Sequence, residues 1–161
     1  LAHAIGGMVI GGIWHTPHLL KGDAPAKPAR KADLDLEHVR LVTDGMCEVV
    51  NGAGTAYGSR IPGIEMCGKT GTAQTASNEY QKAKNIRLKD NAWFVAFAPR
   101  VNPEIAVAVL FEEGEHGPLA GTIARDIVKA YFDKKTRKEV SQNQPSTVTA
   151  GLPVPRTGAA N

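Results

Sequence analysis

The side chains best suited to chemistry lie together in the run Gly68-Lys69-Thr70-Gly71-Thr72-Ala73-Gln74. Lys69 offers a positive charge and three hydrogen-bond donors, and Thr70 and Thr72 offer hydroxyl groups beside it. The glycines of the run carry no side chain, so the backbone of a ligand can approach closely. This combination suits an anionic ligand, and the sequence therefore predicts a site for a carboxylate or a phosphate.

A phosphate ligand is the alternative hypothesis. Residues 63–70 match the phosphate-loop pattern G-x-x-x-x-G-K-[ST] letter for letter. That motif holds phosphates only between a buried strand and the N-terminus of a helix. Residues 59–62 do not read as a buried strand, and the residues after Thr70 are poor helix formers. A carboxylate ligand is therefore our first hypothesis, with P-loop nucleotide binding as the alternative.

The element that must position these groups is a strand over residues 64–74. Alternation along a strand places one set of side chains on one face: Cys67, Lys69, Gly71 and Ala73. Thr70 and Thr72 fall on the other face, so Lys69 and Thr70 can serve one ligand only if it lies along the strand edge. Glycine in a strand often marks close backbone approach. We therefore predict an edge strand whose open side accepts an extended peptide.

Apolar patterning predicts the remaining elements. Residues 92–98 and 105–111 read as strands, and their short link permits only an antiparallel hairpin. Residues 1–13 read as the end of a buried helix that stops at Gly11-Gly12, and another helix is expected from Asp33 or Asp35 to near Asn51-Gly52. Residues 75–90 read as a long exposed polar loop, either a lid over the site or simply a mobile segment.

A last helix is expected to start at Pro118 and to end in the basic run near residue 134. Its predicted packing face is apolar: Leu119, Ile123, Ile127, Val128 and Tyr131. His116, in the charged turn before this helix, reads as a surface residue. Residues 134–161 are rich in polar residues and lack apolar periodicity, so a disordered tail is expected there.

Length and composition narrow the class of protein. The 161 residues suffice for one domain, and the net charge of +3 comes from mixed charges without interleaved aromatic residues, which argues against nucleic-acid binding. No stretch is long enough for a transmembrane helix. The chain starts at Leu1 inside an apolar pattern, so we expect a piece of a longer protein.

Cysteine and histidine residues give weaker signals. The two cysteines, Cys47 and Cys67, lack CxxC spacing. A disulfide between them is possible, but we expect two buried free thiols. A metal site at His3, His15 and His18 would need a further ligand, so these read as ordinary loop histidines.

The anion-binding run and its surroundings resemble the class B high-molecular-weight penicillin-binding proteins, in particular the branch that acts in cell elongation. Lys-Thr-Gly is one of the motifs of penicillin-binding proteins and serine β-lactamases. Flanking segments match in order: Pro17–Leu20, Asp44–Met46, Val49–Asn51, Gly54–Ala56, Ala92–Pro99, Asn102–Pro103, Ile105–Val109, Gly117–Pro118 and Gly121–Thr122. The resemblance covers residues 1–133 and implies an α+β fold, in which an antiparallel sheet is packed against helices.

The resemblance implies a function: peptidoglycan D,D-transpeptidation through an acyl-serine, with penicillin trapping the same serine. It assigns proton movement and a positive field to Lys69, and binding of the substrate carboxylate to the hydroxyls of Thr70 and Thr72. Gly71 would keep the strand clear, and the amide of Thr72 would be one of two oxyanion-hole donors. A penicillin sensor or a β-lactamase-type domain shares the triplet and is a further alternative.

The resemblance also implies the setting of the protein. No cofactor and no metal are expected. The expected partners are peptidoglycan stem peptides, β-lactams, the missing N-terminal part of the same protein, and other membrane proteins of cell elongation. The expected location is the inner membrane, with this domain on the periplasmic side and the anchor outside this chain.

Two motif elements of the family are missing from the chain. No S-x-x-K begins at any serine, namely Ser59, Ser77, Ser141 or Ser146. The one literal S-x-N match, residues 141–143, follows the Lys-Thr-Gly triplet where the family element precedes it, so we read it as chance. The nucleophile is therefore expected upstream of Leu1.

We predict that this chain alone forms no covalent adduct with penicillin, because it lacks the serine nucleophile. The measurement is in-gel fluorescence after incubation with a labelled penicillin, with an intact class B penicillin-binding protein as the positive control. A covalently labelled band from the isolated chain would contradict the prediction.

Overall fold

The structure is a computed structural model that describes residues 1–20 and 29–143. Its elements follow one another along the chain: α1 (Ala2–Val9), β1 (Ile13–Trp14), β2 (Arg30–Lys31), α2 (Leu36–Asn51), the 3₁₀-helix η1 (Tyr57–Ser59), β3 (Cys67–Ala73), α3 (Asn78–Lys84), β4 (Asn91–Ala98), β5 (Ile105–Phe111) and α4 (Gly117–Asn143). Helices and antiparallel strands are thus combined, and the expected α+β class is confirmed.

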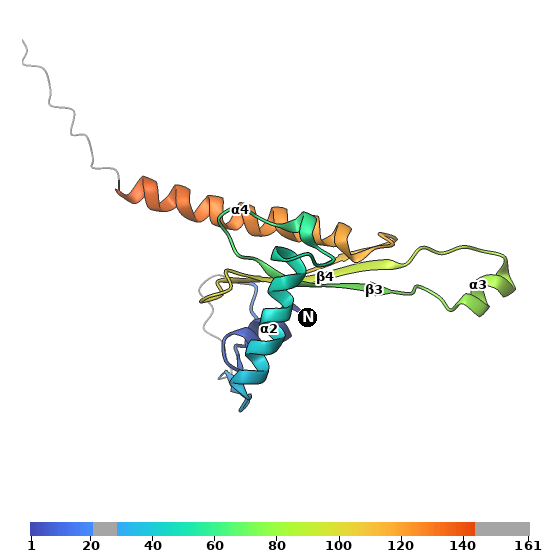
Figure 1. Ribbon diagram of the computed structural model, residues 1–161, viewed down its shortest axis with the longest axis horizontal. Helices are drawn as coiled ribbons and strands as arrows, with labels where there is room; N and C mark the ends of the chain where they lie inside the picture. Colours follow the sequence, from blue (N-terminus) through green and yellow to red (C-terminus); the bar gives the residue numbers. More distant parts are fainter. Residues whose placement is uncertain (21–28, 144–161) are drawn as a thin grey trace, which may run out of the picture.

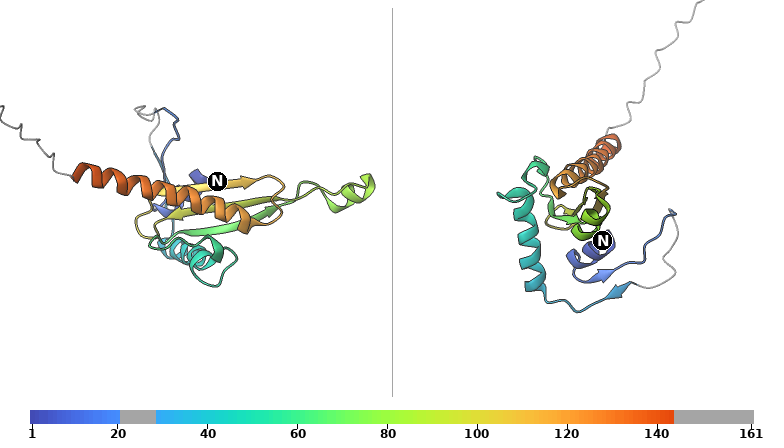
Figure 2. Two further views of the ribbon diagram at one scale, coloured as in Figure 1. Left: turned by 90° about the horizontal axis from the view of Figure 1, so that it is seen from above. Right: turned by 90° about the vertical axis from the view of Figure 1, so that its right-hand side faces the viewer.

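The centre of the fold is a three-stranded antiparallel sheet in the order β3-β4-β5. Lys69 of β3 lies opposite Val95 of β4, which lies opposite Ala108 of β5. The long helix α4 runs along one face of this sheet, and α1 lies on the opposite side (Figure 1). Figure 2 shows α2 standing beside the sheet, roughly across the strand direction. The predicted hairpin and the edge position of β3 are both confirmed.

Two apolar clusters fill the two faces of the sheet. Phe94 of β4 points toward α4 and packs with Ala124 and Val128 of that helix. Phe97, three positions along the same strand, belongs to the opposite cluster, where α1 and α2 contribute Met8 and Met46. Side chains of one strand therefore fix helices on both sides, as the alternation of a buried central strand requires.

The packing face of α4 differs from the prediction. The buried residues of the helix include Ala120, Ala124 and Val128, whereas the other four residues of the predicted face are partly exposed: Leu119, Ile123, Ile127 and Tyr131. Both rows have helical spacing and differ only by an offset of one residue. The row of small side chains faces the sheet because it lets the helix axis approach Phe94, which larger side chains would prevent.

Helix α4 is also longer than predicted, because it continues to Asn143. The expectation of disorder from residue 134 is therefore wrong for residues 134–143, and the rest of that tail lies outside the described residues. Lys and Arg have good helix propensity. Lys135 also binds Glu104 with an Nζ–Oε2 distance of 2.7 Å. An anchored helix can thus extend without apolar periodicity.

Residues 75–90 are more ordered than a simple loop. They contain α3, which lies at the far end of the extended β3–β4 hairpin (Figure 1). Gln81 of α3 holds the segments before and after this helix, because its amide donates to the Ala76 carbonyl over 3.1 Å and its side-chain oxygen accepts from Leu88 N over 2.8 Å.

Sequence reasoning also missed the short strand β2, which pairs with β1.

Helix α2 starts as predicted. The Asp35 carboxylate accepts hydrogen bonds from the backbone N–H groups of Glu37 and His38, so the N-cap is confirmed.

Within residues 1–20 and 29–143, none of the helices combines the length and the hydropathy needed to cross a bilayer.

The expectation of two free thiols is wrong. Cys47 of α2 and Cys67 of β3 form a disulfide, with their Cα atoms 4.0 Å apart. Both residues are almost fully buried, at 3% and 0% exposure. The spacing of the cysteines in the sequence could not reveal this, because it is the packing of α2 on β3 that brings them together.

The identity of the packing face of α4 can be tested with two neighbouring residues. Val128 is 0% exposed and Ile127 is 45% exposed. Val128→Ala is expected to lower the free energy of unfolding by about 2 kcal/mol. Ile127→Ala, which removes more atoms, is expected to cost less than about 1 kcal/mol. Urea unfolding of both variants measures the difference, and the reverse order of costs would refute the assignment.

Candidate functional site

The site is built on the open edge of β3, which pairs with β4 on its other side. The Met66 carbonyl, next to the first residue of the strand, accepts a hydrogen bond from the Asn51 side-chain amide over 2.9 Å. The Thr70 carbonyl accepts one from the Lys69 ammonium over 2.7 Å. Because backbone groups alternate in direction along a strand, the N–H and C=O groups of Gly68 and Thr72 share this outward direction. The backbone of Thr72 is therefore available to a ligand at the edge.

Lys69 and Thr70 meet at this edge although their side chains leave opposite faces of the strand. The Lys69 side chain is exposed and bends back so that its ammonium lies against the Thr70 carbonyl. On the other face, Thr70 Oγ1 lies 3.1 Å from Thr55 Oγ1, in the link that follows α2. A positive charge and an oriented hydroxyl thus flank the same stretch of backbone, which is the arrangement expected of a carboxylate site.

The start of α4 lies directly against the middle of β3. A Cβ atom at Gly117 would lie 2.8 Å from Thr70 Cβ and 3.0 Å from the N and O atoms of Gly71. Only glycine fits this contact without displacement of the strand. The N-terminus of a helix carries a partial positive charge, so α4 adds to the positive field of Lys69 near the edge.

Thr55 and Gly117 are residues of the site that sequence reasoning did not single out. The signals were present in the turn Gly54-Thr55-Ala56 and in the dipeptide Gly117-Pro118. The sequence presents both segments only as flanking matches of the family, and it gives no sign that both contact the Thr70 side chain.

A polar pocket of about 330 Å³ continues from the end of β3. It lies between the α3 arm and the turn before α4, and it is lined by both charge signs, including Lys89 and Glu115. The Lys89 Nζ and Glu115 Oε2 atoms are 4.0 Å apart. His116 lines the pocket as an exposed residue, in agreement with its predicted surface position.

The structure contradicts the phosphate-loop alternative. Thr70 is followed by further residues of β3, which runs to Ala73, and not by a helix N-terminus. The predicted cradle of amides between a strand and a helix is therefore not formed.

The histidines of the metal hypothesis are not assembled into a ligand set. His3 Nε2 donates to the His15 backbone carbonyl over 2.9 Å, which occupies the ring in a structural contact. No group of three or more His, Cys, Asp or Glu side chains with metal-binding geometry occurs in the part of the chain that the structure describes.

Comparison with known proteins agrees with the family resemblance of the sequence. Residues 1–129 match the penicillin binding protein transpeptidase domain. The chain is 36% identical over 126 residues to the peptidoglycan D,D-transpeptidase MrdA of Acinetobacter baumannii, a match that covers 69% of this chain. The chain spans only 18% of that relative's length.

Solved structures agree with the sequence match. Penicillin-binding protein A of M. tuberculosis, as an imipenem acyl-enzyme complex, has a TM-score of 0.62 and 28% identity over 81% of this chain and 29% of that one. Penicillin-binding protein 2 of Helicobacter pylori, in complex with MreC, has a TM-score of 0.59 and 30% identity over 78% of this chain and 23% of that one.

The contact between α4 and β3 predicts a strict requirement for glycine at residue 117. Gly117→Ala is expected to lower the free energy of unfolding by about 1–3 kcal/mol, because the added methyl group overlaps Thr70 and Gly71. Gly58→Ala is the matched control, since a Cβ atom there meets nothing within 4 Å, and it is expected to change stability by less than about 0.5 kcal/mol. Urea unfolding provides the measurement, and equal effects of the two substitutions would contradict the close contact.

Proposed function

Since the chain belongs to the family of penicillin-binding protein transpeptidase domains, we propose that it is the C-terminal part of a class B peptidoglycan D,D-transpeptidase. Residues 1–133 would contribute one wall of an acyl-transfer site whose serine lies in an upstream segment of the same protein. The observation that carries the proposal is the open edge of β3, where the Lys69 ammonium lies against the outward-facing Thr70 carbonyl.

The substrate in this proposal is a stem peptide ending in D-Ala-D-Ala that lies along β3 as an added strand. Its terminal carboxylate is bound by Lys69 and by the hydroxyls of Thr70 and Thr72. Gly71 leaves the strand clear for the peptide. The outward-facing N–H of Thr72 donates to the oxyanion, and the Thr72 carbonyl accepts an N–H of the substrate.

The chemistry is acyl transfer through serine. The chain's own residues supply binding of the substrate, a positive electrostatic field and proton movement. The serine hydroxyl of an S-x-x-K motif attacks the carbonyl carbon of the penultimate D-Ala, an ester forms, and the terminal D-Ala leaves with a proton. An amine of a neighbouring stem peptide then attacks the ester and releases the serine. Lys69 stabilises the negative charge that develops during both steps, and neither step requires a cofactor or a metal.

Two surfaces of the structure support a missing part of the same protein. The outer residues of α4 form a partly exposed apolar row: Leu119, Ile123, Ile127 and Tyr131. Strand β5 is the other edge of the sheet, and its residues Leu110 and Phe111 are also partly exposed. We propose that the N-terminal part of the protein covers this row and pairs with β5, because apolar patches of this kind mark interaction surfaces.

The disulfide supports a location outside the reducing cytoplasm. We propose that this domain works in the periplasm and that a membrane anchor lies outside this chain. The H. pylori relative forms a complex with MreC, which supports a partner protein for the intact enzyme. The imipenem acyl-enzyme of the M. tuberculosis relative supports β-lactams as covalent ligands.

The proposal predicts that Lys69 is required for acylation of the full-length protein. Lys69→Gln removes the charge at the strand edge and is expected to lower the second-order rate constant of acylation by penicillin on the order of 100-fold. Lys129→Gln is the matched control, because Lys129 is an exposed lysine that pairs with Asp133 on α4. Stopped-flow measurement with a fluorescent penicillin provides the rate constants.

Three results would count against the proposal. They are no acylation of the wild-type protein, equal rates for Lys69→Gln and wild type, or an acyl-enzyme that hydrolyses within seconds. The last result would instead indicate a β-lactamase-type domain.

A further inference from the structure

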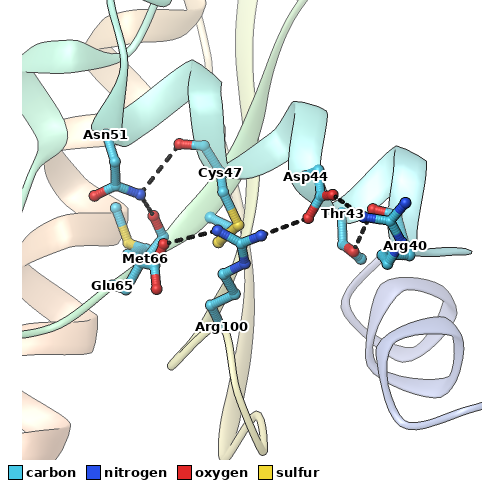
Figure 3. The surroundings of a disulfide bond; sticks show 9 residues. Arg40, Thr43, Asp44, Cys47, Asn51, Glu65, Met66 and Arg100 are labelled. Carbon is cyan, nitrogen blue, oxygen red and sulfur yellow. Dashed lines mark hydrogen bonds and ion pairs between the residues drawn. A yellow bond between two sulfur atoms is a disulfide. The ribbon is translucent and has the colours of Figure 1, made fainter.

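One face of helix α2 is connected to three consecutive residues immediately before the Lys69 run. Asp44, Cys47 and Asn51 lie at spacings of three and four on the helix, so they share this face. Arg100 bridges Asp44 to Glu65, and Cys47 is bonded to Cys67. Asn51 donates a hydrogen bond to the Met66 carbonyl (Figure 3). We propose that these connections, which we call the α2–β3 clamp, position Lys69 and the Thr72 amide for acylation. The proposal rests on the proposed function.

The disulfide is the covalent part of the clamp. Cys67 lies two positions before Lys69, and alternation puts both side chains on the same face of β3. Cys67 is 0% exposed, whereas Lys69 is exposed. The bond to Cys47 therefore fixes the strand at the last buried side chain on this face before Lys69.

Asn51 fixes the backbone at the same point. Its side-chain amide donates to the Cys47 carbonyl over 3.1 Å and to the Met66 carbonyl over 2.9 Å. Met66 has the same outward backbone direction as Thr70 and Thr72. Asn51 therefore binds the open edge just before the segment that we assign to the ligand, and it sets where the free part of the edge begins.

Arg100 is the ionic part of the clamp, and it comes from the turn between β4 and β5. Its guanidinium lies 2.6 Å from Asp44 Oδ1 and 3.2 Å from Glu65 Oε1. Hydrogen bonding to Glu65, together with the charges of Asp44 and Glu65, raises the pKa of Arg100 above its ordinary value. The charged guanidinium joins the hairpin, α2 and the segment before β3.

The clamp and Thr55 hold the strand on the two sides of Lys69. The chain leaves α2 and reaches Thr55, whose hydroxyl holds Thr70 over 3.1 Å. Residues 65–67 are held before Lys69 and Thr70 is held after it, so α2 and its following link determine where the strand edge lies. A displacement of about 1 Å in a catalytic group can cost roughly 100-fold in rate. Loss of the clamp should therefore be measurable in acylation.

The first test uses the full-length protein with the double substitution Cys47→Ala/Cys67→Ala and, separately, Arg100→Gln. Each is expected to lower the second-order acylation rate constant about tenfold. Arg40→Gln is the matched control, because Arg40 also binds Asp44 but its other partner is Glu37, within α2. It is expected to leave the rate constant unchanged. Rates are measured well below the unfolding midpoint of each variant, so that loss of folded protein does not contribute.

A second test covers the case in which the double variant does not fold. Dithiothreitol reduces the wild-type disulfide by supplying two electrons and two protons, and it leaves as its cyclic disulfide. The acylation rate constant is expected to fall about tenfold as two thiols become titratable. Reoxidation by glutathione disulfide, which is reduced to two glutathione thiols, is expected to restore it. A purely structural role would lower the unfolding midpoint but leave the rate constant unchanged at low temperature.

The outcomes separate the two proposals. Unchanged acylation in Arg100→Gln and in the reduced protein would overturn the positioning role of the clamp and leave the transpeptidase proposal intact. No acylation of the oxidised wild-type protein would overturn the transpeptidase proposal itself. An equal loss in Arg40→Gln and Arg100→Gln would also overturn the clamp, because the effect would then belong to Asp44 within α2.

Discussion

The constraint on which the rest of the structure depends is that β3 must be rigid while one of its edges stays open. A strand that pairs on one side only gains half of the backbone hydrogen bonds of a central strand and is prone to slippage or to pairing with other chains. In this protein, contacts on the two faces of the strand replace the restraint that hydrogen bonds to a second neighbouring strand would provide. Cys67 is bonded to α2 on one face, and Gly117 of α4 presses against Thr70 and Gly71 on the other.

This arrangement explains why the functional run combines a long charged side chain with glycines. Glycine at residue 68 allows the Phe94 ring to approach the strand closely, because a Cβ atom there would overlap that ring, and a Cβ atom at Gly71 would lie 3.2 Å from Trp93 Cβ. The same absence of side chains leaves the backbone accessible at the edge. Lys69 is flexible, but its contact with the Thr70 carbonyl keeps its charge next to that backbone.

The sequence allowed the strand of the candidate site and the hairpin to be predicted, because alternation, glycine content and hairpin length are local properties. The edge position of β3 and the Asp35 cap followed from such rules. Two of the errors concern contacts between distant segments. The Cys47–Cys67 bond depends on how α2 meets β3, and the packing face of α4 depends on how closely that helix approaches Phe94. Neither distance is encoded in the spacing of residues along one element.

The small-residue row of α4 has a consequence for how this protein can vary. Gly117, Ala120, Gly121 and Ala124 fill the contact with the sheet almost without side chains, so each position excludes larger residues. The outer row of the same helix is bulkier, yet within this chain it is free to change in size. The inconspicuous alanines and glycines of α4 should therefore tolerate the fewest replacements.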